Sequence, residues 1–228
     1  MAKTSRLKVL NSIMQEGLLP LFYNTNADVV VEVIHACLIG GAGCFEFTNR
    51  GDCAYDVFRQ VTERMKDEPH LVLGAGTIMD SATAALYIQA GAAFIVSPNL
   101  NPDVARLCNR RKIAYFPGCG TVSEISQAEE LGIEICKVFP GGSVGGPGFV
   151  KNVLGPMPWS NLLPTGGVEA TEENVSAWIK AGAIAVGIGS SLFKKEIIDN
   201  KDYQRITELV KNMLHWIQVA RDGKSPLG

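Results

Sequence analysis

The chain contains 228 residues, with 21 Lys and Arg against 23 Asp and Glu, so its formal net charge is only −2. A charge this close to balance offers no electrostatic footprint for nucleic acid or an anionic membrane, and we expect neither as a partner. The N-terminal residues pass directly into an amphipathic pattern without a long apolar stretch. This pattern predicts neither a signal peptide nor a membrane span, and it favours a cytoplasmic enzyme.

Apolar runs of strand length alternate with helical patterns along the chain, which is typical of consecutive βαβ units and a parallel sheet. Eight runs are predicted as strands: Leu18 to Tyr23, Cys44 to Thr48, Leu71 to Thr77, Phe94 to Ser97, Ala114 to Pro117, Ile135 to Phe139, Asn161 to Thr165 and Ile184 to Gly187.

Eight helical segments follow these strands in turn: Asp28 to Ile39, Cys53 to Lys66, Ser81 to Ala90, Pro102 to Asn109, Val122 to Leu131, Gly148 to Leu154, Thr171 to Ala181 and Tyr203 to Val219. Several begin at a capping residue, such as Asp80, Thr121 or Thr171. Several others end at a glycine, as helices commonly do.

Eight such units in this length describe a compact (β/α)8 TIM barrel of the α/β class. An N-terminal helix precedes the first strand, and no linker or change of composition divides the chain. We therefore expect residues 1–228 to form a single domain. A doubly wound open sheet is the alternative architecture, although it does not demand eight near-equal units.

The six cysteines include no Cys-x-x-Cys pair, and the three histidines are scattered along the chain. In a chain of this size and context, such cysteines are expected to be reduced and mostly buried. We predict no disulfide framework, no metal site and no cofactor.

Polar residues gather where the predicted strands end. In a barrel of this kind the carboxyl ends of the strands build the active site. Because side chains alternate along a strand, Glu46, Thr48 and Arg50 share one face, and Lys137 shares a face with Phe139. If both faces point inward, one acid and two bases meet at the mouth of the barrel. The alternative is a structural ion pair of Glu46 with Lys137 or Arg50, but a buried ion pair is a weak stabilising device.

Lys137 lies inside an apolar run, where a lysine is costly. A buried ammonium group loses its hydration, so its pKa falls and the neutral, nucleophilic amine becomes accessible. Enzymes activate Schiff-base lysines in this way. The alternative is a lysine near a strand end whose charged group reaches solvent or a partner.

Two glycine-rich turns follow the last two predicted strands. Gly166-Gly167 ends the seventh strand, and Gly189-Ser190 follows the eighth. Glycines at such turns let backbone N–H groups approach an anion. Barrels commonly bind phosphate at these two positions, so the turns together predict a phosphorylated small-molecule substrate.

Two further glycine-rich stretches do not match nucleotide-binding motifs. Residues Gly141 to Gly148 lack the Gly-Lys-Ser/Thr ending of a P-loop, and Gly74-Ala75-Gly76-Thr77 lacks the third glycine of a dinucleotide-binding fingerprint. The position of the first stretch predicts either a flexible loop over the mouth of the active site or a plain connector.

From about Asn11 to the C-terminus, the ordered motifs resemble those of the class I aldolases that cleave 2-keto-3-deoxy-6-phosphogluconate (KDPG) and 4-hydroxy-2-oxoglutarate (KHG). The matching motifs are Glu46-x-Thr48-x-Arg50, Gly74-Ala75-Gly76-Thr77, Ser97-Pro98, Pro117-Gly118 with Thr121-Val122-Ser123-Glu124, Lys137-x-Phe139-Pro140, Pro164-Thr165-Gly166-Gly167 and Gly189-Ser190.

The resemblance implies a role for each candidate residue. Lys137 would form the Schiff base with the C2 ketone, and Glu46 would relay protons. Arg50 and Thr77 would hold the carboxylate of the pyruvate half. The substrate pocket would be shaped by Pro98, Phe139 and Thr165, and the phosphate would be bound by Gly166, Gly167, Gly189 and Ser190. Relatives are commonly homotrimers.

The implied reaction is cleavage of KDPG to pyruvate and glyceraldehyde 3-phosphate. KHG or 2-keto-3-deoxy-6-phosphogalactonate is the alternative substrate, because departures from the family pattern touch the rim of the site. Asn49 stands where relatives usually carry an apolar residue, and Gly51 where they carry Thr or Ser. Two other functions are a phosphate-binding barrel isomerase or epimerase with Glu46 as base, and a sugar-acid sensor without catalysis.

Overall fold

The computed structural model describes residues 4–223. Its strands are β1 (Leu18–Phe22), β2 (Cys44–Thr48), β3 (Val72–Gly76), β4 (Phe94–Val96), β5 (Ala114–Phe116), β6 (Gly118–Cys119), β7 (Cys136–Val138), β8 (Leu162–Pro164) and β9 (Val186–Ile188). Its helices are α1 (Arg6–Glu16), α2 (Ala27–Gly40), α3 (Ala54–Arg64), α4 (Ser81–Gln89), α5 (Pro102–Arg111), α6 (Val122–Glu130), α7 (Gly146–Leu154), α8 (Glu172–Lys180), α9 (Lys195–Asp199) and α10 (Tyr203–Asp222).

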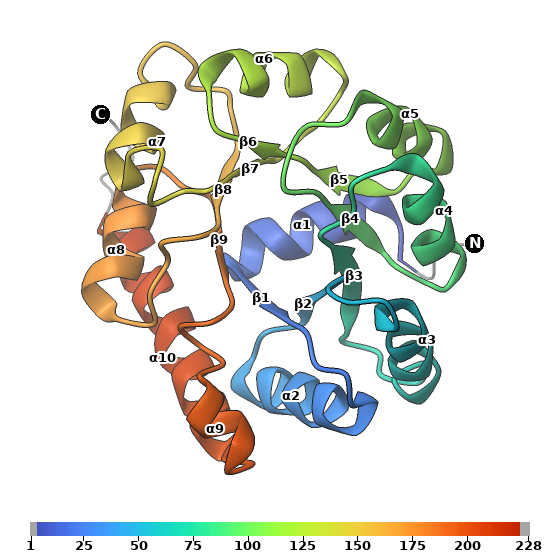
Figure 1. Ribbon diagram of the computed structural model, residues 1–228. Coiled ribbons are helices and arrows are strands. Elements are labelled where there is room, and N and C mark those ends of the chain that lie inside the picture. The colour runs from blue at the N-terminus through green and yellow to red at the C-terminus, as the bar shows by residue number, and fades with distance from the viewer. Residues whose placement is uncertain (1–3, 224–228) are drawn as a thin grey trace.

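The fold is mixed α/β, and its strands pair in parallel. One sheet has the order β5-β4-β3-β2-β1-β9 and a second has the order β6-β7-β8. Figure 1 shows the strands curled around a common centre, with most helices on the outside. A parallel bridge between Thr165 and Gly187 links the end of β8 to β9.

The structure differs from the predicted elements in two places. The fifth predicted strand, Ala114 to Pro117, ends one residue earlier at Phe116, because Pro117 has no N–H group to donate to a neighbouring strand, and the unpredicted two-residue strand β6 follows it. The carbonyl of Pro117 still accepts a hydrogen bond from the Lys137 amide at 3.0 Å. The short helix α9 was not predicted, since five residues carry too little periodicity to reveal a helix.

The predicted helix starts at Asp80, Thr121 and Thr171 are confirmed. Each of these residues is an N-cap whose side chain accepts a hydrogen bond from a backbone N–H in the first turn of its helix. Such a bond satisfies one of the donors that a helix start leaves free. The caps set where α4, α6 and α8 begin, and therefore how long the loops after β3, β6 and β8 can be.

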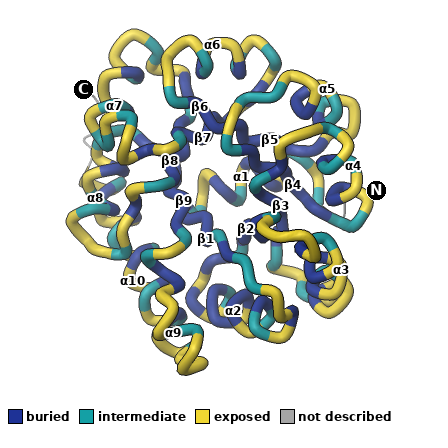
Figure 2. Tube along the Cα trace, viewed as in Figure 1, coloured by how far each residue is buried: buried dark blue, intermediate teal, exposed yellow. Residues whose placement is uncertain are grey.

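Helix α1 packs against the inner side of the strands. Its residues Val9, Leu10 and Ile13 form one buried cluster with strand residues, among which Cys44, Val72, Phe94 and Ala114 are each the first of their strand. In Figure 1, α1 crosses behind the ring of strands, and Figure 2 shows the strands as the most buried part of the chain. Because α1 covers the amino-terminal ends, the carboxyl ends are the end that is open to a substrate.

No helix in residues 4–223 combines the length and the apolar character needed to cross a membrane.

Candidate active site

Glu46 and Lys137 come from different sheets, and both are buried in the middle of their strands. Glu46 lies in β2 and is 1% exposed, and Lys137 lies in β7 and is 6% exposed. The Oε2 atom of Glu46 is buried without a hydrogen-bond partner. Such an atom is costly in an apolar interior, so it marks a place where a ligand or water can bind.

The predicted alternative of a structural ion pair does not hold for this pair. Among the ion pairs in the described part of the chain, none involves Glu46, Lys137 or Arg50. The two buried groups nevertheless influence each other electrostatically. They are therefore close enough to interact without forming a direct ion pair.

Burial shifts the pKa of both groups toward the neutral form. It lowers the pKa of Lys137, an effect that the Glu46 charge opposes and the Arg50 charge strengthens. It raises the pKa of Glu46, which the charges of Lys137 and Arg50 oppose. Desolvation therefore gives the lysine access to its nucleophilic form and the carboxyl group access to its acidic form.

Three glycines make the space around the buried groups. A Cβ on Gly76 would lie 1.7 Å from Glu46 Oε1, one on Gly187 would lie 2.4 Å from Thr165 Oγ1, and one on Gly118 would lie 2.1 Å from the Pro98 carbonyl oxygen. Real Cβ atoms do not approach other atoms this closely, so the side chains of Glu46 and Thr165 take these positions only because the glycines leave them free.

We expect Gly76→Ala to lower turnover by about 100-fold or more, because the new methyl group pushes the Glu46 carboxyl group out of place. The three nearest atoms that it meets all belong to the flexible Glu46 side chain, so Glu46 moves and the fold survives. Steady-state kinetics with a thermal melt tests this. Gly148→Ala is the matched control, since a Cβ there meets nothing within 4 Å. Equal turnover in the two variants contradicts the prediction.

The residues predicted to bind the pyruvate half follow neighbouring strands. Arg50 follows β2, and its side chain is exposed. Thr77 follows β3 with a φ of 60°, which is strained for a β-branched residue. Backbone strain of this kind is often held at functional sites. The hydrogen bond from the Ile78 amide to the Val96 carbonyl, at 3.1 Å, helps to hold it here.

The residues predicted to shape the pocket lie around Lys137. The ring centroid of Phe139 is 4.9 Å from the Lys137 Nζ atom. Thr165 follows β8, and its Oγ1 atom is buried without a partner. Pro98 follows β4 and is half-buried. Each of these residues stands at the carboxyl end of its strand, as the sequence predicts for the mouth of the site.

The two predicted phosphate turns are brought together, because β8 and β9 are neighbours. Gly166 and Gly167 have φ angles of 78° and 83°, a region that favours glycine. Within residues 4–223, the backbone N–H groups of Gly166, Gly167 and Ser190 donate no hydrogen bond to a protein acceptor. Together they can donate to an anion.

A cavity of about 580 Å³ adjoins the two turns. Gly167 and Ser190 line it, and so do Lys194 and Arg205, which the sequence did not single out. Lys194 is the N-cap of α9, a helix that the sequence did not predict, so its place beside the turns could not be foreseen.

The stretch Gly141 to Gly148 is tied down at both ends. The Gly141 amide donates to the Thr165 carbonyl at 2.9 Å, and the Gly142 amide donates to the Gly166 carbonyl at 2.7 Å. The last residues form the first turn of α7. A Cβ on Gly167 would lie 2.7 Å from the Gly142 Cα, so this stretch packs directly against one of the phosphate turns.

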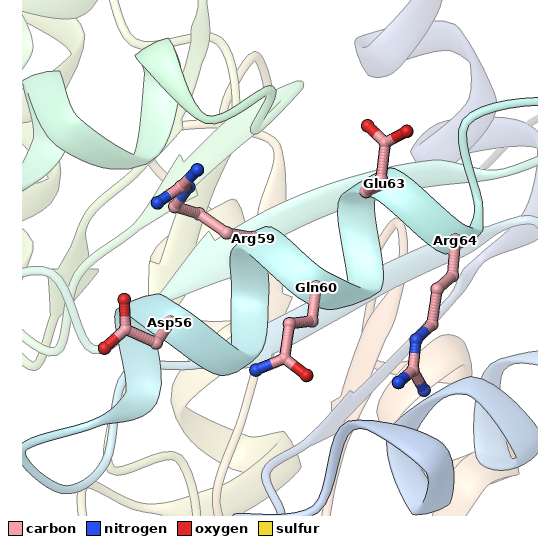
Figure 3. Close-up of a pocket in the computed structure, with 5 residues that line it drawn as sticks. All are labelled: Asp56, Arg59, Gln60, Glu63 and Arg64. Atoms are coloured by element: carbon pink, nitrogen blue, oxygen red, sulfur yellow. The ribbon is translucent and has the colours of Figure 1, made fainter.

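Other surface features lie away from this constellation. A hollow of about 490 Å³ is lined by five residues that all come from α3, namely Asp56, Arg59, Gln60, Glu63 and Arg64 (Figure 3). Arg64 pairs there with Asp28 of α2. Across residues 4–223, no group of three or more His, Cys, Asp and Glu side chains is arranged to hold a metal ion.

Comparison with known proteins gives a consistent result. The family model described as KDPG and KHG aldolase matches residues 9–209. The 2-dehydro-3-deoxy-phosphogluconate aldolase of Haemophilus influenzae is 26% identical over 211 residues, which is 92% of this chain and 97% of the relative. The KHG/KDPG aldolase of Escherichia coli K12 is 29% identical over 201 residues, covering 88% of this chain and 92% of the relative.

A solved structure agrees with these relatives. The 2-keto-3-deoxy-6-phosphogluconate aldolase of Zymomonas mobilis ZM4, crystallised with 3-phosphoglycerate, superposes with a TM-score of 0.80 at 25% identity, over 91% of this chain and 95% of that one. Fold, site and relatives together define a lyase that acts on carbon–carbon bonds. The chain belongs to the KDPG and KHG aldolase family.

Proposed function

We propose that the protein cleaves KDPG to pyruvate and glyceraldehyde 3-phosphate through a Schiff base on Lys137. The observation that carries this proposal is a buried lysine whose pKa is lowered by burial and which interacts with a buried glutamate whose pKa is raised. A lysine and a carboxyl group with opposed shifts are suited to covalent and acid–base work, respectively.

The proposed steps use these two side chains alone. Glu46 takes a proton from the Lys137 ammonium group, the neutral amine attacks the C2 ketone, and Glu46 returns that proton as the carbinolamine loses water to leave a protonated imine. Glu46 takes the proton of the C4 hydroxyl group, the C3–C4 bond breaks, and its electron pair moves into the imine to give an enamine. Glyceraldehyde 3-phosphate leaves. The enamine takes at C3 the proton that Glu46 removed from the C4 hydroxyl group, and hydrolysis of the resulting protonated imine releases pyruvate and restores the Lys137 ammonium group.

The remaining residues bind the two ends of the substrate. Arg50 and Thr77 hold the carboxylate, for which the exposed guanidinium group of Arg50 offers paired donors. Pro98, Phe139 and Thr165 shape the pocket between them. The phosphate binds Gly166, Gly167, Gly189 and Ser190, a choice supported by the free N–H groups of these turns. The neighbouring Lys194 adds positive charge at this end.

The proposal includes the architecture and assembly. The chain forms one domain, in which the two sheets close into a single (β/α)8 barrel. The bridge from Thr165 to Gly187 supports closure on one side, and the separation of β5 from β6 by Pro117 alone supports it on the other. By its resemblance to the family, the protein is a homotrimer of the cytoplasm that needs no cofactor.

A panel of substrates tests the reaction, with pyruvate release as the readout. We expect KDPG to be cleaved faster than its unphosphorylated counterpart, and faster than KHG or 2-keto-3-deoxy-6-phosphogalactonate. A preference for one of the others changes the substrate but keeps the chemistry. A barrel isomerase would release no pyruvate, and it would leave the buried Lys137 without a role. A sensor would bind the acids without turnover.

Replacing Ser190 by Ala tests the phosphate end. We expect use of KDPG to weaken by about 10-fold or more, because a charge-assisted hydrogen bond is worth roughly 1.5 to 3 kcal/mol. Exchange catalysed on pyruvate alone should hardly change, since pyruvate does not reach this end of the site. If Ser190→Ala slows both reactions equally, the two glycine turns are structural and the phosphate assignment is wrong.

A further inference from the structure

Asn49 makes two hydrogen bonds that join different parts of the fold. Its backbone N–H donates to the Gly76 carbonyl at the end of β3, at 2.8 Å. Its side-chain oxygen Oδ1 accepts a hydrogen bond from the Tyr87 hydroxyl group of α4, at 2.9 Å. Asn49 therefore ties the loop after β2 both to the next strand and to the helix that follows that strand.

The backbone hydrogen bond joins two residues, Asn49 and Gly76, and each of them directly precedes one of the proposed carboxylate-binding residues. Arg50 is the next residue after Asn49, and Thr77 is the next residue after Gly76. The Arg50 side chain is exposed, and no ion pair in the described residues holds its guanidinium group. The direction of the Arg50 side chain is thus set mainly by the Arg50 backbone, and the hydrogen bonds of the preceding residue, Asn49, hold that backbone in place.

Tyr87 is a rigid anchor for this loop. Its side chain is 1% exposed. Its ring packs against Phe58 and Tyr55 of α3, at centroid distances of 4.9 and 5.4 Å. Because the Tyr87 ring is packed by its neighbours, its hydroxyl group is held in one place. The hydrogen bond from this hydroxyl group to Asn49 therefore restricts the movement of the loop after β2.

We propose that the Asn49–Tyr87 hydrogen bond positions Arg50 and Thr77 for the carboxylate of the substrate. Asn49 and Tyr87 are then positioning residues for binding of the pyruvate half. This inference rests on the proposed function.

Pyruvate binding provides the test, because pyruvate carries the carboxylate and the ketone but no phosphate. Borohydride reduces the imine on Lys137 to a stable amine, and the yield of adduct against pyruvate concentration gives a half-saturation value. For Tyr87→Phe we expect this value to rise by about 3-fold to 10-fold, the effect of losing one neutral hydrogen bond. The rate at saturating substrate should stay within about 2-fold of the parent.

The matched control is Tyr55→Phe. Tyr55 lies in the same aromatic cluster, and no hydrogen bond of its hydroxyl group occurs among the described residues, so its half-saturation value should equal that of the parent. Asn49→Leu removes the other partner and should act like Tyr87→Phe. Both single variants lose the same hydrogen bond. The half-saturation value of the double variant should therefore be no higher than that of the single variant with the higher value.

The outcomes separate the inference from the function beneath it. If the parent forms no adduct with pyruvate, the proposed function fails. If the parent forms it and Tyr87→Phe and Asn49→Leu both leave the half-saturation value unchanged, the positioning role is wrong. Additive effects in the double variant, or an equal change in Tyr55→Phe, also overturn it. Should Tyr87→Phe fail to fold, the comparison of Asn49→Leu with the parent decides the question.

Discussion

Replacing Lys137 by Met should abolish the covalent adduct that pyruvate and borohydride form with the parent protein, and should lower turnover by roughly 10,000-fold or more. Losses of this order follow when the nucleophile of a covalent mechanism is removed. Methionine has a similar length and no charge, so it can occupy the buried position that Lys137 holds in β7. Mass spectrometry of the reduced protein and steady-state rates measure the two effects.

Lys151→Met is the control for this substitution, because Lys151 lies exposed on α7 and takes no part in the proposed steps. It should give the parent's adduct and the parent's rate. An adduct on any lysine other than Lys137, or the absence of one while the parent turns over, would falsify the Schiff-base assignment.

The same substitution has an expected effect on stability that depends on pH. The pKa of Lys137 is lowered in the folded protein, so between that value and the ordinary lysine pKa the unfolded chain holds more protons. The free energy of unfolding of the parent then rises with pH through this interval. The Met variant lacks this rise. Its gain in stability over the parent should be largest below the interval and should shrink as the pH approaches about 10.4, the ordinary lysine value.

The candidate chemical centre could be proposed from the sequence because the relevant signals are local. A lysine within an apolar run, and an acid, a hydroxyl group and a base at alternate positions of one strand, can be recognised without any knowledge of distant contacts. The same holds for the alternation of strands with helices and for the capped helix starts. These features depend on the period of the chain and on neighbours within a few residues.

The missed features depend on contacts between distant residues. Asn49 and Tyr87 are 38 positions apart, and nothing in either segment indicates their hydrogen bond. The space that Gly76 leaves for Glu46 requires the register between β2 and β3 to be known. The exposure of Arg50 likewise follows from its place in the loop after β2, which strand parity alone does not determine.

The second large effect is expected for Glu46→Gln, which keeps the shape of the side chain and removes its titrating group. Positioned acid–base groups contribute about 100-fold to 10,000-fold, and turnover should fall within that range. The pyruvate adduct on Lys137 should still form, since imine formation needs the amine, although it should form more slowly. Rates of KDPG cleavage and of adduct formation, measured side by side, distinguish proton transfer from nucleophilic attack.

The pH profile adds a readout that a structural role for Glu46 would not produce. Burial raises the pKa of its carboxyl group, so the base form appears at higher pH than for an exposed glutamate. The acidic limb of kcat/KM in the parent should therefore lie above pH 4.5, and it should be missing from the Gln variant.

Glu16→Gln is the matched control, because burial also raises the pKa of the Glu16 carboxyl group, but Glu16 ends α1 at the opposite end of the strands. Its carboxylate accepts hydrogen bonds from the Gly43 and Cys44 amides, both at 3.0 Å. The control variant should change stability and leave the rate per folded molecule as it is in the parent. If Glu46→Gln is as fast as the parent, or if its acidic limb is unchanged, Glu46 has no part in proton transfer. The raised pKa of Glu46 would then reflect burial alone.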